Sequence, residues 1–235
     1  PIEPQVSSLK LAPHIIVATP GRLLRLLERD VLTLKHITYV VLDEADRMFE
    51  MGFDEAIVKI EKQLPHKRQT LLFSATYPEA LHVSAKKILK TPETIALEDK
   101  PSALDEWAIH TSNHQKLNTL LDCLEHYQPE RVLVFCNAKT TCDDLQNTLE
   151  REGILALVLH GDKDQKERTD TLQRFHHGSA PLLLATEVAA RGLDISGIPL
   201  IINYDVPRSL QSYTHRIGRT ARNETPGQAI TLVDN

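Results

Sequence analysis

Cysteine and long apolar runs are scarce in this 235-residue sequence. The cysteines, Cys123, Cys136 and Cys142, are odd in number and form no Cys-x-x-Cys pair, which argues against a secreted disulfide framework and favours buried thiols in a reducing compartment. No apolar stretch approaches the roughly 20 residues that a membrane span requires. The amino-terminal residues also lack the order of a signal peptide. We therefore expect a cytoplasmic location and no contact with a membrane.

Positive charge and aromatic side chains are also in short supply. The formal net charge is −5 and the pI is about 6.1, which excludes a polybasic protein that binds anions through its overall charge. A local basic groove stays compatible with this balance. Aromatic residues make up 5% of the chain, so stacking of bases on aromatic platforms is not expected to dominate any nucleic-acid contact. The eleven histidines show no metal-ligand spacing.

A phosphate-binding loop is missing as well. No Gly-x-x-x-x-Gly-Lys-Ser/Thr run occurs, so the sequence supplies neither the backbone amides nor the lysine with which such a loop holds the β- and γ-phosphates of a nucleotide. The first residue is Pro1 rather than Met, and it opens a segment whose composition predicts a loop. We expect the chain to begin inside a longer gene product.

What the sequence does contain is an alternation of short apolar runs and amphipathic stretches, which is typical of α/β proteins with parallel sheets. The first set predicts strands at 15–19, 39–43, 70–74 and 94–97, with helices at 21–28, 54–63 and 78–89. The second set predicts strands at 132–136, 156–159, 182–185, 200–203 and 229–233, with helices at 116–126, 139–152, 165–176 and 210–217.

A polar segment with a helix-breaking proline separates the two sets, as is typical of a linker. We place the linker at 98–106, between a first domain at 1–97 and a second domain at 107–235. The first domain holds only the later strands of its sheet in this interpretation. We expect it to be incomplete.

Acidic residues follow the apolar run that ends at Asp43, in the order Asp43-Glu44-Ala-Asp46. Ligands of open parallel sheets bind outside the carboxyl ends of the strands, where Asp43, Ser74 and Thr186 are all expected. Asp43 would hold Mg²⁺ through its water shell, because Mg²⁺ commonly keeps several waters. Glu44 would orient and deprotonate an attacking water. Taken alone, the Asp-Glu pair also fits the start of a solvated helix.

Arginines dominate the run His215-Arg-Ile-Gly-Arg-Thr-Ala-Arg222 near the other end of the chain. Arg219 and Arg222 lie three residues apart, so one helix face could present both guanidinium groups to a γ-phosphate. A helix with several arginines is also often a solvated face. Gly218, inside this run, would lower the stability of a helix. Its presence favours a specific local requirement over an ordinary solvated helix.

Together these motifs resemble the DEAD-box family of ATP-dependent RNA helicases, named for the four residues at 43–46, over nearly the whole chain. Further motifs of that family are matched by Thr19-Pro-Gly-Arg22, Ser74-Ala-Thr76, Val134-Phe-Cys-Asn137, His160 to Arg168 and Ala185 to Asp194. The resemblance implies two RecA-like domains, with the cofactors ATP and Mg²⁺ and with RNA as the partner. It is similar in wording to bacterial members that remodel ribosomal RNA.

The resemblance also implies roles for single residues. Sequence-tolerant contacts to the RNA backbone are implied for Thr19, Arg22, Gln165, Arg168 and Thr186. Coupling of hydrolysis to domain movement is implied for Asp46, Ser74, Thr76 and His215, and nucleotide contacts for Asp43, Asp194, Arg219 and Arg222. Two departures stand out: Ala221 replaces a more usual glycine, and Glu187 replaces a more usual aspartate.

Three functions stay open on the sequence. The first is an ATP-dependent RNA helicase, of which this chain is a fragment, that remodels RNA by ATP-driven domain closure. The second is an RNA-binding or regulatory module without ATP turnover, which the missing phosphate loop favours. The third is a DNA-directed helicase of the same superfamily. Some motifs also have simple structural interpretations: Thr19 could be a plain helix cap before an exposed arginine, and Gln165 and Arg168 an ordinary surface pair.

Overall fold

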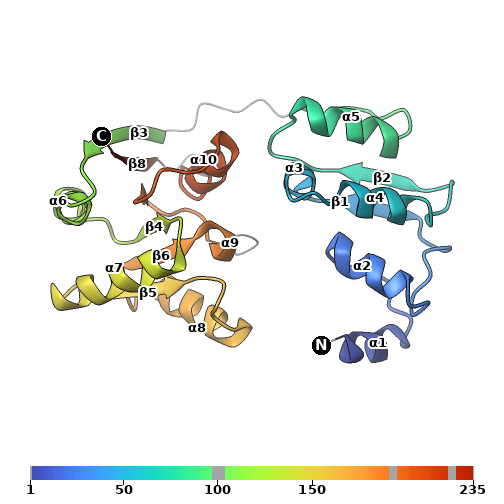
Figure 1. The fold of residues 1–235 in the computed structure, drawn as a ribbon, viewed down its shortest axis with the longest axis horizontal. Helices are drawn as coiled ribbons and strands as arrows, with labels where there is room; N and C mark the ends of the chain where they lie inside the picture. The colour runs from blue at the N-terminus through green and yellow to red at the C-terminus, as the bar shows by residue number, and fades with distance from the viewer. Residues whose placement is uncertain (1, 97–103, 191–194, 222–225, 235) are drawn as a thin grey trace. The chain divides into compact units, whose positions relative to one another are not determined.

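The computed structural model describes residues 2–96, 104–190, 195–221 and 226–234 (Figure 1). The chain divides into two units, residues 1–96 and 97–235. Every described strand pair is parallel, and a helix lies between each strand and the next along the chain within a unit. The predicted α/β class is therefore confirmed, with one small and one larger parallel sheet.

The first unit contains a two-stranded sheet, β1 paired with β2, whose register runs from Tyr39↔Gln69 to Leu42↔Leu72. Its elements are α1 (Glu3–Leu9), α2 (Pro20–Leu27), β1 (Tyr39–Leu42), α3 (Ala45–Glu50), α4 (Asp54–Glu61), β2 (Gln69–Leu72) and α5 (Glu79–Ile88). The loop predicted at the amino terminus is wrong, because α1 is a helix. A proline in its first positions and Glu3 in its first turn both favour a helix start.

The strands predicted at 15–19 and 94–97 are not found as strands among the described residues. Residues 15–18 make no described backbone hydrogen bond, although Thr19 has an extended backbone. Ile15 is 82% exposed and Val17 is 94% exposed. A strand is defined by its pairing with a neighbour, and an apolar run without such a neighbour does not form a ladder. Residues 92–96 are irregular, and Leu97 lies outside the described residues.

The second unit is built on a six-stranded sheet of order β3-β8-β7-β4-β6-β5. Its elements are β3 (Leu104–Thr111), α6 (Lys116–Tyr127), β4 (Val132–Cys136), α7 (Lys139–Arg151), β5 (Ala156–Leu159), α8 (Gln165–His176), β6 (Leu182–Thr186), α9 (Glu187–Ala190), β7 (Leu200–Asn203), α10 (Leu210–Ile217) and β8 (Gly227–Asp234). All five strands and four helices predicted for this unit are present, and no predicted bound is off by more than two residues.

The predicted linker at 98–106 is wrong at its end, because β3 begins at Leu104. This strand pairs with β8 in a register that runs from Leu104↔Gly227 to Thr111↔Asp234. Its polar start resembles a linker because β3 lies at the edge of the sheet, where most of its side chains face solvent. Residues 97–103 lie outside the described part of the chain.

The core of the second unit lies on both faces of its sheet. In the fully buried strand β4, Val132, Val134 and Cys136 pack into one apolar cluster, with residues of α6 and α7. Leu133 and Phe135 pack into a second cluster, with residues of α8 and α9. Cys123, Cys136 and Cys142 are all buried free thiols, as the sequence predicts. This layered packing brings the carboxyl ends of β4, β6 and β7 to one edge of the sheet.

Candidate functional site

The acidic residues of the first unit lie in a turn at the end of β1. Asp43 and Glu44 are exposed, and the Glu44 backbone N–H donates to Asp43 Oδ1 at 2.9 Å. Glu44 has φ 49° and ψ 48°, a left-handed conformation that costs a non-glycine residue about 1 kcal/mol. The Ala45 N–H donates to the Phe73 carbonyl at 3.0 Å, which ties the turn to the end of β2. The strained turn therefore leaves both carboxylates open to water.

Asp46 lies one step further, at the start of α3, and is only 3% exposed. Its Oδ2 accepts hydrogen bonds from the Thr76 backbone N–H at 3.1 Å and from Thr76 Oγ1 at 2.7 Å. Ser74 Oγ accepts from the Asp46 N–H at 3.2 Å and donates to the Thr76 carbonyl at 2.6 Å. Hydrogen bonds therefore join these three residues, to which the family resemblance assigns one role. Their role in coupling hydrolysis to movement stays a prediction.

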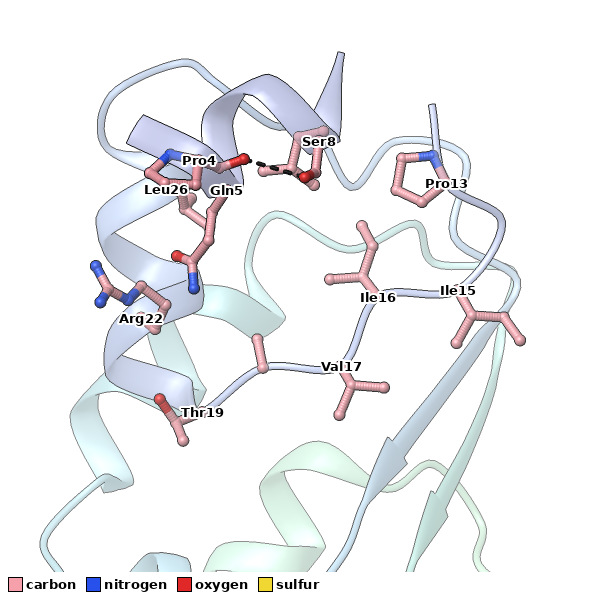
Figure 2. A pocket seen from close by; sticks show the side chains of 12 residues that line it. Pro4, Gln5, Ser8, Pro13, Ile15, Ile16, Val17, Thr19, Arg22 and Leu26 are labelled. Atoms are coloured by element: carbon pink, nitrogen blue, oxygen red, sulfur yellow. Dashed lines mark hydrogen bonds between the residues drawn. The ribbon is translucent and has the colours of Figure 1, made fainter. Parts of the chain in front are cut away.

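Thr19 and Arg22 lie at the start of α2, on the rim of a pocket of about 740 Å³ between α1, α2 and the segment 13–19 (Figure 2). Thr19 is the N-cap residue of α2, as the cap interpretation predicts, but its side chain makes no capping hydrogen bond. Its carbonyl accepts from the Arg22 N–H at 3.1 Å. The Thr19 side chain is exposed, and it lines this pocket together with Gln5 and Arg22 (Figure 2).

Gln165 and Arg168 lie in the first turn of α8, where a capping box fixes the helix start. Glu167 N–H donates to Asp164 Oδ1 at 2.9 Å, and Asp164 N–H donates to Glu167 Oε2 at 2.7 Å. Gln165 is exposed. Arg168 is half-buried and its Nη2 donates to the Ala189 carbonyl at 2.9 Å, so it is not an ordinary surface arginine. It joins the start of α8 to the end of α9.

Thr186 is the last residue of β6 and is half-buried. Glu187 follows it directly as the first residue of α9, and its side chain is 15% exposed. The position of Thr186 at a strand end agrees with the prediction for this edge of the sheet. Asp194 and Arg222 lie outside the described residues.

The prediction that one helix face presents both Arg219 and Arg222 is wrong for Arg219. The helix α10 ends at Ile217, and Gly218 is its C-cap, so Arg219 lies in the turn that follows. Gly218 has φ −63°, which any residue can adopt, but a Cβ built on it would lie 3.1 Å from the Thr214 carbonyl oxygen, which is a tight contact. His215 and Arg219 are both half-buried.

Arg216 was not predicted as a site residue, although it lies inside the arginine motif. Arg216 is 2% exposed, and its Nη2 donates to Asn137 Oδ1 at 2.7 Å. Burial lowers its pKa, while the neighbouring Glu187 and Asp205 carboxylates act in the opposite direction. Arginine stays charged in proteins under these conditions. Arg216 and Ser212 lie four residues apart and therefore share one face of a helix. The structure buries both residues on that face of α10.

No three histidine, cysteine, aspartate or glutamate side chains of the described chain converge on a common metal position. The exposed carboxylate of Asp43 fits a Mg²⁺ ion held through water, because that mode needs only one or two protein carboxylates. In the described ranges, no helix is both long and apolar enough to span a bilayer.

Family comparisons cover both units. Residues 1–83 match the DEAD/DEAH box helicase family, and residues 115–224 match the helicase conserved C-terminal domain. The chain is 43% identical over 234 residues to the ATP-dependent RNA helicase DbpA of Escherichia coli, an alignment that covers 99% of this chain and 51% of that protein. The chain spans about half the length of the curated relatives it matches.

Solved structures agree with these matches. Dbp5 of S. cerevisiae bound to RNA and ADP BeF3 superposes with a TM-score of 0.81 at 32% identity, covering 94% of this chain and 59% of that one. A hypothetical ATP-dependent RNA helicase from Sulfolobus tokodaii has a TM-score of 0.56 at 34% identity, covering 100% of this chain and 69% of that one. With its acidic turn, its Asp46 hydrogen bonds and its arginine motif, this chain belongs to the DEAD-box family of RNA helicases.

Proposed function

We propose that this chain is part of an ATP-dependent RNA helicase that remodels or unwinds RNA duplexes through ATP-driven closure of its two units. The observation that carries the proposal is the hydrogen-bonded joint between Asp46 and the Ser74–Thr76 turn, directly behind Asp43 and Glu44. The joint connects the ends of two paired parallel strands, the edge where such sheets bind ligands. A shift of the carboxylates during hydrolysis would reach the second strand end through these bonds.

In the proposed reaction, water would attack the γ-phosphate of ATP, the bond from the γ-phosphorus to the bridging oxygen would break to release ADP, and Glu44 would accept the proton of the attacking water. Asp43 would hold Mg²⁺ through water, and the ion would neutralise charge on the phosphate oxygens. Arg219 and Arg222 would stabilise the charge that develops on the transferring group. Asp194 would accept a hydrogen bond from the ribose. The exposure of Asp43 and Glu44 supports these roles, since both must be reached by water and nucleotide.

RNA is the proposed partner, and it is bound through its backbone. Thr19 and Arg22 in the first unit, and Gln165, Arg168 and Thr186 in the second, would contact phosphates and sugars. Because the formal net charge is −5, attraction to RNA would come from local clusters of basic residues and not from the overall charge of the chain. DNA would bind less well, because the family resemblance points to recognition of the 2′-hydroxyl. The resemblance of the motifs to those of bacterial family members that remodel ribosomal RNA makes ribosomal RNA the first substrate to test.

A second candidate function is an RNA-binding or regulatory module without ATP turnover. The absence of a phosphate-binding loop from the sequence favours it for the 235-residue chain. Without the loop amides and lysine, no described group of the first unit is expected to replace their grip on the β- and γ-phosphates. The two candidates differ in turnover, whereas both predict binding of RNA.

The test is ATP hydrolysis by this chain with and without single-stranded RNA, with Glu44→Gln as the control. We expect no turnover. RNA-stimulated turnover that Glu44→Gln abolishes would show that an unrecognised element holds the phosphates. Binding of labelled single-stranded RNA and DNA of the same length is measured in parallel. Equal affinity for both would contradict the RNA assignment.

A chimera separates the two candidates. The phosphate-loop segment of a DEAD-box relative is joined to the amino end of this chain, and hydrolysis is measured again. RNA-stimulated turnover that depends on Glu44 is the outcome expected of a helicase fragment. A folded chimera that binds ATP and RNA without turnover would support the non-enzymatic module.

A further inference from the structure

Arg216 lies at the centre of a buried polar cluster in the second unit. Its Nη2 donates to Asn137 Oδ1 at 2.7 Å, and its Nη1 donates to the Asp205 carbonyl at 3.0 Å. Its Nε lies 3.7 Å from Glu187 Oε2. The guanidinium also lies over the Phe135 ring, 5.2 Å from its centroid. One side chain thus contacts residues from three separate segments of the chain.

The partners of Arg216 follow three neighbouring strands of the sheet. Asn137 follows β4, Asp205 follows β7, and Glu187 comes directly after Thr186 at the end of β6. Arg216 itself lies three residues before Arg219. The Arg216 side chain therefore joins the junction of β6 and α9, proposed to contact RNA at Thr186, to the turn proposed to contact ATP at Arg219.

The frame around Arg216 is itself held by hydrogen bonds and ion pairs. Asp205 Oδ2 accepts from the Asn137 backbone N–H at 2.8 Å. Lys116 Nζ lies 3.7 Å from Asp205 Oδ1 and 2.8 Å from Asp234 Oδ1. Burying charges in this way often gives little stability over an apolar core of the same shape. The buried charges therefore fit a role in holding these side chains in one fixed geometry better than a role in stability.

Resting on the proposed function, we propose that Arg216 is a positioning residue that couples the junction of β6 and α9 at Thr186 to the turn at Arg219, and that it acts on the junction through Glu187. Arg216 is 2% exposed, so its own role is not contact with a phosphate. Lysine could replace the charge that faces Glu187, but not the fork of donors that serves Asn137 and Asp205 at once. Glutamine at position 187 would keep the shape of Glu187 and remove its charge.

The first test is hydrogen exchange, read by mass spectrometry, on the full chain carrying Arg216→Lys or Glu187→Gln. Each variant should speed exchange roughly tenfold in both segments, 186–190 and 210–221, and leave β4, β5 and residues 182–185 of β6 protected. Arg174→Gln, which removes an exposed arginine of α8, is the matched control and should change neither segment. A change confined to the mutated segment, or spread over the whole unit, would overturn the proposal.

The second test is the affinity for a labelled single-stranded RNA over a range of salt concentrations. Arg216→Lys should weaken binding roughly tenfold without changing the salt slope, because no phosphate contact is lost. Arg168→Gln should instead lower the slope by about 1. A lowered slope for Arg216→Lys, or an affinity equal to that of Arg174→Gln, would contradict the positioning role. Failure of the unmodified chain to bind RNA would defeat the proposed function, and the exchange test would still decide the coupling.

Discussion

At the scale of single residues, Ala221 carries a conformation that its side chain disfavours. Its φ is +47°, in the left-handed region where an L-residue other than glycine is strained by about 1 kcal/mol. This positive φ explains why glycine is the more usual residue at this position of the family motif. The small Cβ of alanine is tolerated at a cost in free energy of folding, not by a change of backbone path.

We therefore expect Ala221→Gly to raise the free energy of unfolding of the second unit by up to about 1 kcal/mol. Urea unfolding followed by the fluorescence of Trp107, the only tryptophan and a residue of β3, measures this unit selectively. Ala138→Gly is the control, because Ala138 has φ −121° and gains nothing from glycine. Equal effects of both substitutions would contradict a conformational origin.

Thr76 offers a second prediction at this scale. Thr76→Val removes the Oγ1 donor to Asp46 Oδ2 while keeping the shape of the side chain, and the buried carboxylate loses one of its partners. We expect the first unit to lose about 1–3 kcal/mol of stability, the usual effect of removing a hydrogen bond to a charged group. Hydrogen exchange of α3 and β2 measures the loss. Thr33→Val, at an exposed position, should leave both elements unchanged.

At the scale of elements, β8 can lie close to Thr220 and Ala221, which follow α10, only because residue 227 is glycine. A Cβ built on Gly227 would lie 1.9 Å from Thr220 Oγ1 and 2.6 Å from the Ala221 backbone nitrogen. These distances are impossible for real atoms, so either β8 or the turn must move. Since β8 pairs with both β3 and β7, a shift there would disturb the sheet on two sides.

Gly227→Ala should therefore destabilise the second unit by about 3 kcal/mol or more, at the upper end of overpacking effects. The midpoint of urea unfolding, again read from Trp107, checks this. Gly161→Ala is a matched control, because nothing lies within 4 Å of its added Cβ and its φ is not in the left-handed region. Similar losses for the two variants would show that the contact with Thr220 is not the cause.

The elements also show where sequence patterns predict structure well. Strands such as β4, with five fully buried apolar residues, are evident because a short apolar run between turns has few other uses. The edge strand β3 escapes this rule, since Asp105 to Ala108 face solvent. The run at 15–19 misleads in the opposite direction, because pairing depends on a neighbouring strand and not on local composition. Arg216 was missed for the same reason: its contacts come from segments distant in sequence.

At the scale of the whole molecule, the two units differ in how well they cover their apolar surface. The larger sheet is packed on both faces, whereas the two-stranded sheet leaves Tyr39, Val41 and Phe73 more than half exposed. Together with Ile15 and Val17, these side chains present apolar surface of a kind that isolated soluble domains rarely show. Residues 15–18, which make no described backbone hydrogen bond, leave donors and acceptors open to pairing with another chain.

We therefore predict that the first unit is the less stable part and that it promotes aggregation of the chain. Calorimetry should show two transitions, and the later one should coincide with the change in Trp107 fluorescence. Val17→Lys should reduce aggregation on heating because it places a charge in the apolar segment 15–18. It should not change the temperature of the later transition. Lysine at the exposed Val188 of α9 is the matched control and should not reduce it. One cooperative transition spanning both units would refute this division, since it would require the first unit to share the stability of the second.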